Sequence, residues 1–152
     1  PDLGGDYEVI HHSTLIQEFI DEGKLRIQDG KAYQGKKITF HDSCYLGRAN
    51  NVYEAPRRVI QELDSDLTEM KRSRKNGLCC GAGGAQVFKD AEKGNKEVNT
   101  ERAEEAVATG ADVVAMNCPF CMVMFQDAIK KLDKEEDIEL KDIAEIAAES
   151  LG

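Results

Sequence analysis

Residues 111–121, ADVVAMNCPFC, join a short apolar run directly to two cysteines that are separated by two residues. Residues 111–117 are apolar and partly β-branched, which predicts a buried strand, and Cys118 follows this strand at once. Pro119 suits the first turn of a helix, so both cysteines of CPFC stand where a strand gives way to a helix. A strand followed by a helix is the repeating unit of an α/β domain with a parallel sheet.

Other segments repeat this alternation of strand and helix. Further strands are predicted at residues 7–12 (YEVIHH), 36–42 (KKITFHD) and 66–70 (DLTEM). Helical patterns occupy residues 14–22, 53–63, 95–110 and 138–152. The third of these helices turns Ala103, Ala106 and Val107 inward and stops at Gly110, and the last has one apolar stripe of Leu140, Ile143, Ala144, Ala147 and Leu151. We therefore predict an α/β fold with a small parallel sheet of about four strands, flanked by helices, with the cysteine loops at the carboxyl ends of the strands.

The length and charge of the chain limit its class. With 152 residues it can bury one core, so we expect a single domain over residues 1–152. It has 29 acidic and 20 basic side chains and a formal charge of −9, which argues against binding to nucleic acid or anionic membranes. No apolar run approaches about 18 residues, so we expect no direct membrane insertion. The chain begins without methionine and close to its first predicted strand, so we expect a fragment of a longer polypeptide.

The five cysteines are an odd number and fall at three places: Cys44, Cys79 with Cys80, and Cys118 with Cys121. A secreted disulfide framework favours an even number, so we expect reduced thiols in a cytoplasmic setting. Cys44 follows the strand predicted at 36–42, as Cys118 follows the one at 111–117. Loops at the carboxyl ends of neighbouring parallel strands converge on one crevice, so these two distant thiols can meet there.

The two cysteine pairs are also suited to a shared centre. In CPFC both sulfurs can face one point at a helix entry, where the N-terminal amides favour thiolate over thiol. Adjacent cysteines in a strand would point to opposite faces, but glycines in residues 79–84 (CCGAGG), Gly81 first, permit positive φ and bend the backbone. Glycines also let N–H groups approach sulfur closely, which tunes the potential of a cluster. We expect this loop to wrap a bound group.

The residues alone are compatible with three kinds of site. Structural zinc takes four ligands, usually in two short-spaced pairs, which five thiols with an adjacent pair fit poorly. A thioredoxin-type dithiol has the CxxC spacing but leaves the other three cysteines without a role. An iron–sulfur cluster accepts several thiolates from separate loops, and we favour it over zinc.

Charged residues stand near the cysteines in the sequence. Arg48 follows Cys44 by four residues and is expected to offset the negative charge of thiolates. The adjacent pair is preceded by four basic residues, Lys71, Arg72, Arg74 and Lys75. They either offset the charge of the thiolates as well, form a solvated surface loop, or bind an acidic partner. His41 and Asp42 are expected to line the same crevice. His41 either shuttles protons or bonds to a sulfur there, or its ring is satisfied by local backbone.

The segments HDSCYLGR, CCGAGG and CPFC together resemble the cysteine-rich CCG domain of heterodisulfide reductase. Relatives of that domain include the iron–sulfur subunits of glycolate oxidase and anaerobic glycerol-3-phosphate dehydrogenase, and membrane-linked oxidoreductases that accept electrons from electron-transfer flavoprotein. The family pattern is one cysteine, then an adjacent pair with glycine, then C-x-x-C. In this chain 34 residues separate Cys44 from Cys79, and 37 separate Cys80 from Cys118.

This resemblance implies a [4Fe-4S] cluster, cubane or non-cubane, bound by Cys44, Cys79, Cys80, Cys118 and Cys121. It implies an electron-transfer module that links a flavoprotein to a quinone or a disulfide within a larger oxidoreductase. Family members usually carry two such domains, often behind a ferredoxin-like domain, so this chain resembles the second, C-terminal copy. The expected partners are a second CCG domain, a ferredoxin-like domain and a flavoprotein, with missing regions or partners placing the cytoplasmic domain at the inner face of the membrane. The alternatives are a zinc-stapled interaction domain and a dithiol oxidoreductase that uses CPFC.

Overall fold

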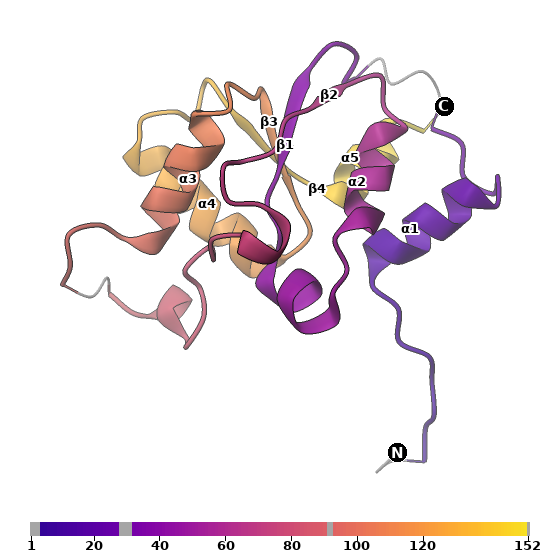
Figure 1. Cartoon of the computed structure of the whole chain (residues 1–152), viewed down its shortest axis with the longest axis horizontal. Coiled ribbons are helices and arrows are strands. Elements are labelled where there is room, and N and C mark those ends of the chain that lie inside the picture. The colour runs from indigo at the N-terminus through magenta and orange to yellow at the C-terminus, as the bar shows by residue number, and fades with distance from the viewer. Residues whose placement is uncertain (1–3, 28–31, 91–92, 152) are drawn as a thin grey trace.

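The computed structural model describes residues 4–27, 32–90 and 93–151. Within these ranges four strands form one sheet in the order β2-β1-β3-β4, and each neighbouring pair is parallel. The strands are β1 Lys37–Phe40, β2 Asp66–Leu67, β3 Val113–Met116 and β4 Glu139–Asp142. Helices flank the sheet on both sides (Figure 1), so the predicted α/β fold is confirmed.

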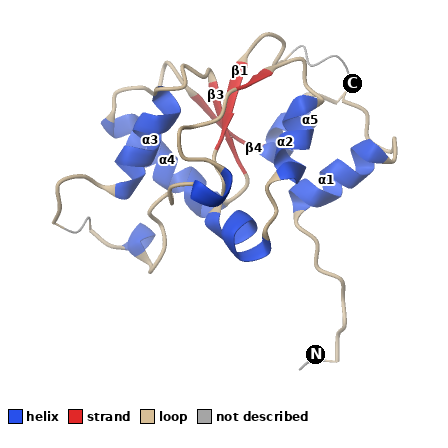
Figure 2. Ribbon diagram, in the orientation of Figure 1, coloured by secondary structure: helices blue, strands red, loops and turns tan. Residues whose placement is uncertain are grey.

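The helices make two outer layers around the sheet. One layer contains α1 His12–Asp21, α2 Glu54–Gln61 and α5 Ile143–Glu149, and the other contains α3 Val98–Val107 and α4 Pro119–Lys131 (Figure 2). The predicted helices at 14–22, 53–63 and 95–110 are therefore confirmed, with ends shifted by a few residues. Among the described residues, no helix combines the length and the apolar character needed to cross a lipid bilayer.

The central strand β3 explains why the sheet is covered on both faces. Val113 and Ala115 belong to the core shared with α2 and α5, whereas Val114 and Met116 belong to the core shared with α3 and α4. All four side chains are fully buried. A parallel strand covered on both faces needs apolar side chains at successive positions instead of an alternating pattern, and this run supplies them.

The predicted strand at residues 7–12 is wrong. Residues 7–11 have no regular secondary structure, and His12 begins α1. Tyr7 and Val9 are 86% and 94% exposed, so the apolar residues of this segment contribute nothing to the core. A β-branched sequence forms a strand only where a neighbouring strand supplies hydrogen bonds, and here the described residues offer none.

The fourth strand comes instead from β4, which lies inside the segment predicted as the last helix. The helix α5 begins at Ile143 because the Asp142 side chain accepts a hydrogen bond from the Ala144 N–H, and Glu145 accepts one from the Asp142 N–H. This capping box ends the backward growth of the helix. The predicted apolar stripe is thus wrong at its ends, since Leu140 lies in β4 and Leu151 is half exposed; Gly152 lies outside the described residues.

Candidate metal centre

The sheet brings the cysteine loops to one edge. Strands β1 and β3 are neighbours, with Phe40 opposite Ala115 near their carboxyl ends. Cys44 comes shortly after β1, at the start of the short helix η1 Tyr45–Ala49, and Cys118 is the N-cap residue of α4. A buried hydrogen bond of 2.6 Å from Ser43 Oγ to Asn117 Oδ1 ties the two loops together directly before their cysteines.

Four of the five thiols interact in series, and the fifth, that of Cys44, lies beside Cys79. The Sγ atoms of Cys80 and Cys121 are 3.3 Å apart, and both residues are buried in the core beneath α4. Cys118 interacts with Cys121, and Cys79 with Cys80. Cys44 is exposed and lines a small hollow together with Cys79. All five are free thiols, so the structure gathers residues from three separate loops without any disulfide between them.

Hydrogen bonds within the group make some of these thiols acidic. The Cys121 thiol, followed by that of Cys79, donates to the sulfur of Cys80 and holds the pKa of Cys80 far below its usual range. The neighbouring sulfurs of Cys118 and Cys80 raise the pKa of Cys121 in turn. The pKa of Cys118 falls to about 6, chiefly through its contact with Cys121, with help from backbone N–H groups at the start of α4. Cys80 and Cys118 are therefore favoured as thiolates, the ligand form that soft metals prefer, whereas Cys79 and Cys121 are favoured as thiols.

Glycine allows the adjacent pair to bend as predicted. Gly81 has a φ of +92°, and its N–H donates to the Sγ of Cys79 at 3.3 Å. A Cβ atom at this position would lie 3.3 Å from the backbone nitrogen of Asn99. Both the conformation and the close approach therefore require the residue without a side chain.

His41 lies beside the buried sulfurs. It is 0% exposed, and one ring nitrogen lies within 4.8 Å of the Sγ atoms of Cys80 and Cys121. Its Nδ1 accepts a hydrogen bond of 3.0 Å from Nε of Arg102, whereas its Nε2 has no partner among the described residues. Burial lowers the pKa of His41; the sulfur of Cys80 acts in the opposite direction, and the charge of Arg102 acts in the same direction as burial. The alternative of a ring satisfied by local backbone is wrong, because the bond to Nδ1 comes from a side chain on α3.

A buried ion cluster anchors the loop before Cys44. Arg57 is 1% exposed and donates to Asp42 at 2.7 and 2.9 Å and to Glu69 at 2.6 and 2.8 Å. Burial opposes the charge of Asp42, but the bonds from Arg57 hold the pKa of Asp42 below its ordinary value. Asp42 lines the hollow beside Cys44, as expected, and also fixes the end of β1 to α2.

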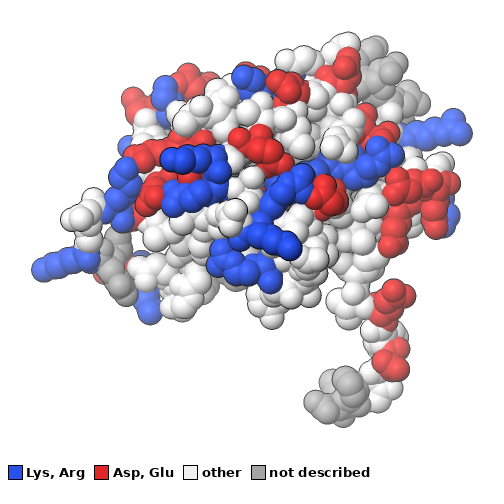
Figure 3. Space-filling view, in the orientation of Figure 1, with Lys and Arg blue, Asp and Glu red and all other residues white. Residues whose placement is uncertain are grey.

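The basic residues near the cysteines divide into two kinds. Arg48 lines the hollow with Cys44 and Cys79 and donates to the Gly77 carbonyl at 3.0 Å. Arg72 and Arg74 form ion pairs, Arg72 with Glu101 and Glu105 and Arg74 with Glu54 and Glu69, and Arg74 also lines the hollow. Lys71 and Lys75 are exposed. Lys and Arg side chains gather over the middle of the face in Figure 3, interleaved with acidic ones.

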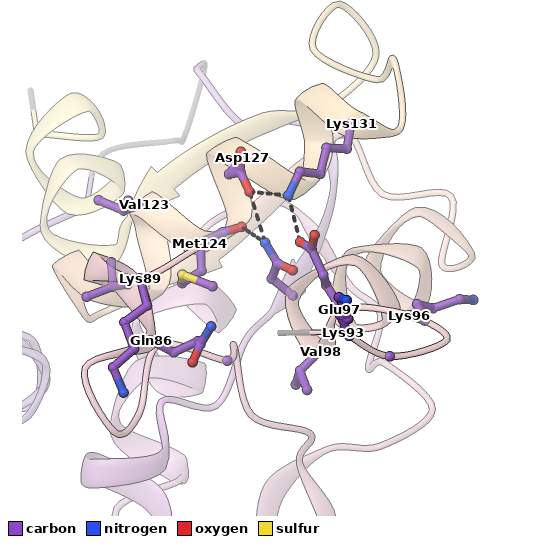
Figure 4. Close-up of a pocket in the computed structure, with 14 residues that line it drawn as sticks. Gln86, Lys89, Lys93, Lys96, Glu97, Val98, Val123, Met124, Asp127 and Lys131 are labelled. Atoms are coloured by element: carbon purple, nitrogen blue, oxygen red, sulfur yellow. Dashed lines mark hydrogen bonds and ion pairs between the residues drawn. The ribbon is translucent and has the colours of Figure 1, made fainter. Parts of the chain in front are cut away.

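A cavity of about 610 Å³ opens next to the cysteine loop, between α3, α4 and residues 86–89 and 93–97 (Figure 4). Gly81 and Met124 stand between this cavity and the sulfurs. On its far side Lys131 bridges Glu97 and Asp127 at 2.6 and 2.8 Å. The backbone of the cysteine loop is therefore reachable from the surface on this side.

Sequence reasoning missed Arg57, Arg102, Ser43 and Asn117. A signal for Arg102 was present, because Asn99, Arg102, Ala103 and Ala106 follow the three- and four-residue spacing of one helix face, and all four are buried. No comparable signal exists for Ser43 and Asn117, whose contact depends on the pairing of β1 with β3.

The comparisons with known proteins agree with this site. Residues 38–126 match the family model of the CCG cysteine-rich domain, a range that contains all five cysteines. The "Probable iron-sulfur-binding oxidoreductase FadF" of Bacillus subtilis is 41% identical over 152 residues, covering 99% of this chain and 21% of the relative. No solved structure matches at a significant level.

Two further relatives are oxidoreductases by name. The "EtfAB:quinone oxidoreductase" of Syntrophomonas wolfei is 34% identical over 96% of this chain and 21% of its own length. A subunit of the "Dihydromethanophenazine:CoB--CoM heterodisulfide reductase" of Methanosarcina mazei is 34% identical over 96% of this chain and 34% of its own length. The chain thus spans a fifth to a third of these relatives. Because the family model covers more than half of the chain, including the whole cysteine group, the chain belongs to the CCG family of cysteine-rich domains.

Proposed function

We propose that this domain binds an iron–sulfur cluster and serves as an electron-transfer module of a larger oxidoreductase. The observation that carries the proposal is the group of five free thiols, with Cys80 and Cys121 buried and their sulfurs 3.3 Å apart. The names of the relatives support it, because they describe an iron–sulfur-binding oxidoreductase, a quinone oxidoreductase and a heterodisulfide reductase.

The residues present fit such a group. Thiolates are the ligands that iron–sulfur clusters use, and these thiolates come from three loops that meet at one edge of the sheet. The Nε2 of His41 is buried without a partner beside them, and a buried N–H without an acceptor is costly. A bound group rich in sulfur would provide that acceptor.

Each residue of the site has a proposed role. The ligands are Cys44, Cys79, Cys80, Cys118 and Cys121. Gly81 lets the backbone fold closely around them, and Arg48 and the N-terminus of α4 offset their negative charge. The bound cluster, of the [4Fe-4S] type, holds one electron at a time. The surrounding core excludes water from Cys80 and Cys121, whereas the exposed Cys44 marks the side on which electrons enter or leave.

The length of the relatives supports a place in a larger assembly, because this chain covers 21–34% of them. We propose that it is the C-terminal CCG domain of a longer cytoplasmic polypeptide. A second CCG domain, a ferredoxin-like domain and a flavoprotein are its proposed neighbours, and a quinone or a disulfide is the final acceptor. Quinone reduction would place the assembly at the inner face of the membrane through regions other than this domain.

Metal analysis of anaerobically prepared protein tests the cluster. We expect a brown protein that contains iron and acid-labile sulfide, and we expect Cys44→Ser and Cys118→Ser each to reduce the iron content. Ala82→Ser, which adds a serine to the loop of Cys79 and Cys80 without removing a thiol, is the control and should retain iron. Zinc alone would favour the interaction-domain alternative, and activity without metal would favour the CPFC dithiol. Either result, or unchanged iron in both cysteine variants, contradicts the proposal.

The adjacent pair distinguishes four ligands from five. A cubane cluster needs four thiolates, so either Cys79→Ser or Cys80→Ser should then leave the cluster intact. A non-cubane cluster with five ligands, which we favour, should change or be lost in both variants. Electron paramagnetic resonance spectra and iron-to-protein ratios measure the outcome. One substitution that leaves both unchanged would rule out the five-ligand arrangement.

A further inference from the structure

Arg102 is a buried cation beside the cysteine group for which the proposed function has no role so far. It is 0% exposed on α3, and its Nε donates to Nδ1 of His41 at 3.0 Å. Its Nη1 donates to the Arg72 carbonyl and to the Glu105 carboxylate, at 2.7 Å each. A guanidinium is expensive to bury, so these bonds hold it in one orientation at a substantial desolvation cost.

The bond from Arg102 determines which nitrogen of His41 carries a proton. A guanidinium has donors only, so Nδ1 must accept with its lone pair. The ring is then neutral, and its single proton lies on Nε2. Nε2 has no partner by hydrogen-bond geometry, and one ring nitrogen lies within 4.8 Å of the sulfurs of Cys80 and Cys121, of which Cys80 interacts with the ring. An edge-on contact with Phe125, with ring centroids 4.9 Å apart, helps to hold the ring in this place.

We propose that Arg102 is a positioning residue of the metal centre: it holds His41 in the Nε2–H tautomer, so that the ring offers an N–H donor to the sulfur atoms of Cys80 and Cys121. The tautomer of His41 is set by contacts within this chain and does not require a bound cluster. Its effect on electron transfer rests on the proposed function.

The expected effect is on the reduction potential. Reduction adds negative charge to sulfur, and a hydrogen-bond donor stabilises the reduced state more than the oxidised one. Without Arg102 the ring can move its proton to Nδ1 and turn a lone pair toward the sulfurs. We expect the equilibrium for reduction to become about tenfold less favourable, which is about 59 mV for a one-electron couple.

The tautomer can be read without any metal. The chain has three histidines, so long-range proton–nitrogen correlation spectra of ¹⁵N-labelled protein, purified under reducing conditions, resolve each ring, and His41→Gln identifies the His41 signals. We expect the Nε2–H form in the unaltered chain and the Nδ1–H form, or a mixture, in Arg102→Met. An Nδ1–H ring in the unaltered chain, or no change in the variant, overturns the proposal. Because no cluster is needed, this result is independent of whether the proposed function holds.

A double-mutant cycle on the iron-reconstituted chain separates the tautomer from the charge of Arg102. We expect Arg102→Met and His41→Leu to lower the potential by similar amounts, and the double variant to lower it no further. His41→Gln keeps an N–H donor near the Nε2 position and should stay close to the unaltered chain. The shift caused by Arg102→Met is compared in the chain with His41 and in the chain with Leu at position 41. If the reduction potential shifts equally in both, Arg102 acts through its charge and the proposal is wrong. Should Arg102→Met not fold, Arg102→Leu, which also has no donor, takes its place in both experiments.

Discussion

Replacing Gly81 by valine should damage the metal centre more than the fold. Gly81 has a φ of +92°, and its N–H donates to Cys79 Sγ at 3.3 Å. A Cβ atom there would meet the Asn99 backbone nitrogen at 3.3 Å, the Val98 Cβ at 3.4 Å and the Met124 Cε at 3.5 Å. The Asn99 nitrogen belongs to α3 and cannot move without the helix, so the cysteine loop must move instead.

The magnitude follows from two separate effects. A β-branched residue held at positive φ costs about 1–3 kcal/mol. Crowding against a well-packed neighbour adds about 1–3 kcal/mol. The free energy of unfolding of a domain is about 5–15 kcal/mol, so we expect Gly81→Val to fold. We also expect the cysteine loop to shift, so that Cys79 and Cys80 no longer point to the same centre.

Two other glycines of the same loop are matched controls. Gly84 has a φ of +65° but open space around its Cβ position, so Gly84→Val tests backbone strain alone. Gly83 has neither positive φ nor a close neighbour, so Gly83→Val should change the free energy of unfolding by less than about 0.5 kcal/mol.

The assay measures iron content and the free energy of unfolding by denaturant on the same samples. We expect iron loss in Gly81→Val to exceed its unfolded fraction, and iron to be retained in Gly83→Val. If Gly81→Val is no more destabilising than Gly84→Val, crowding at α3 is not a real effect. If iron is lost only in proportion to unfolded chain, Gly81 is an ordinary glycine of the fold.

Three further predictions concern the residues that hold the site in place. Arg57→Met should lower the free energy of unfolding by about 3–5 kcal/mol, because it leaves the buried carboxylate of Asp42 without its guanidinium partner. A loss below about 1 kcal/mol in a denaturant titration would show that the ion cluster is dispensable. Arg57 holds the pKa of Asp42 in the folded protein below its ordinary 3.8, so this ion pair should stabilise the fold fully above about pH 4. The stabilisation should be lost as the pH falls through the pKa of Asp42 in the folded protein. Acid unfolding followed by circular dichroism should therefore depend less on pH in Asp42→Asn. Asp142→Ala should cost about 1 kcal/mol through loss of the helix cap, whereas Glu145→Gln, which can keep its half of the capping box, should cost less in the same titration.

The residues alone were enough to predict the central half of the fold. The apolar runs before Cys44 and before Cys118 became β1 and β3, because a strand buried on both faces needs continuous apolar residues, which a short window of sequence reveals. The convergence of the loops that carry their cysteines followed from parallel topology, since Ser43 bonds to Asn117, and the positive φ of Gly81 followed from the absence of a side chain. The resemblance to the CCG domain is confirmed by the family match over residues 38–126.

The two strand errors have one physical cause. Residues 7–12 are more apolar than β4, yet β4 is the strand, because it pairs with β3 from Val113 opposite Glu139 to Met116 opposite Asp142. An edge strand takes its hydrogen bonds from a neighbour and needs few apolar residues of its own, since its outer side is not covered by another strand. Local patterning contains no information about which segment reaches that neighbour.

The buried arginines show the same limit at the metal centre. Arg57 and Arg102 stand in charged helices that look solvated, and they are buried only because their partners arrive from elsewhere in the chain: Asp42 and Glu69 around one, His41 and the Arg72 carbonyl around the other. The cost of burying a cation is offset by bonds that exist only after the sheet and helices have packed. The convergence of the cysteine loops could therefore be predicted from strand order and spacing, whereas the surroundings of the thiols are set by contacts between distant segments.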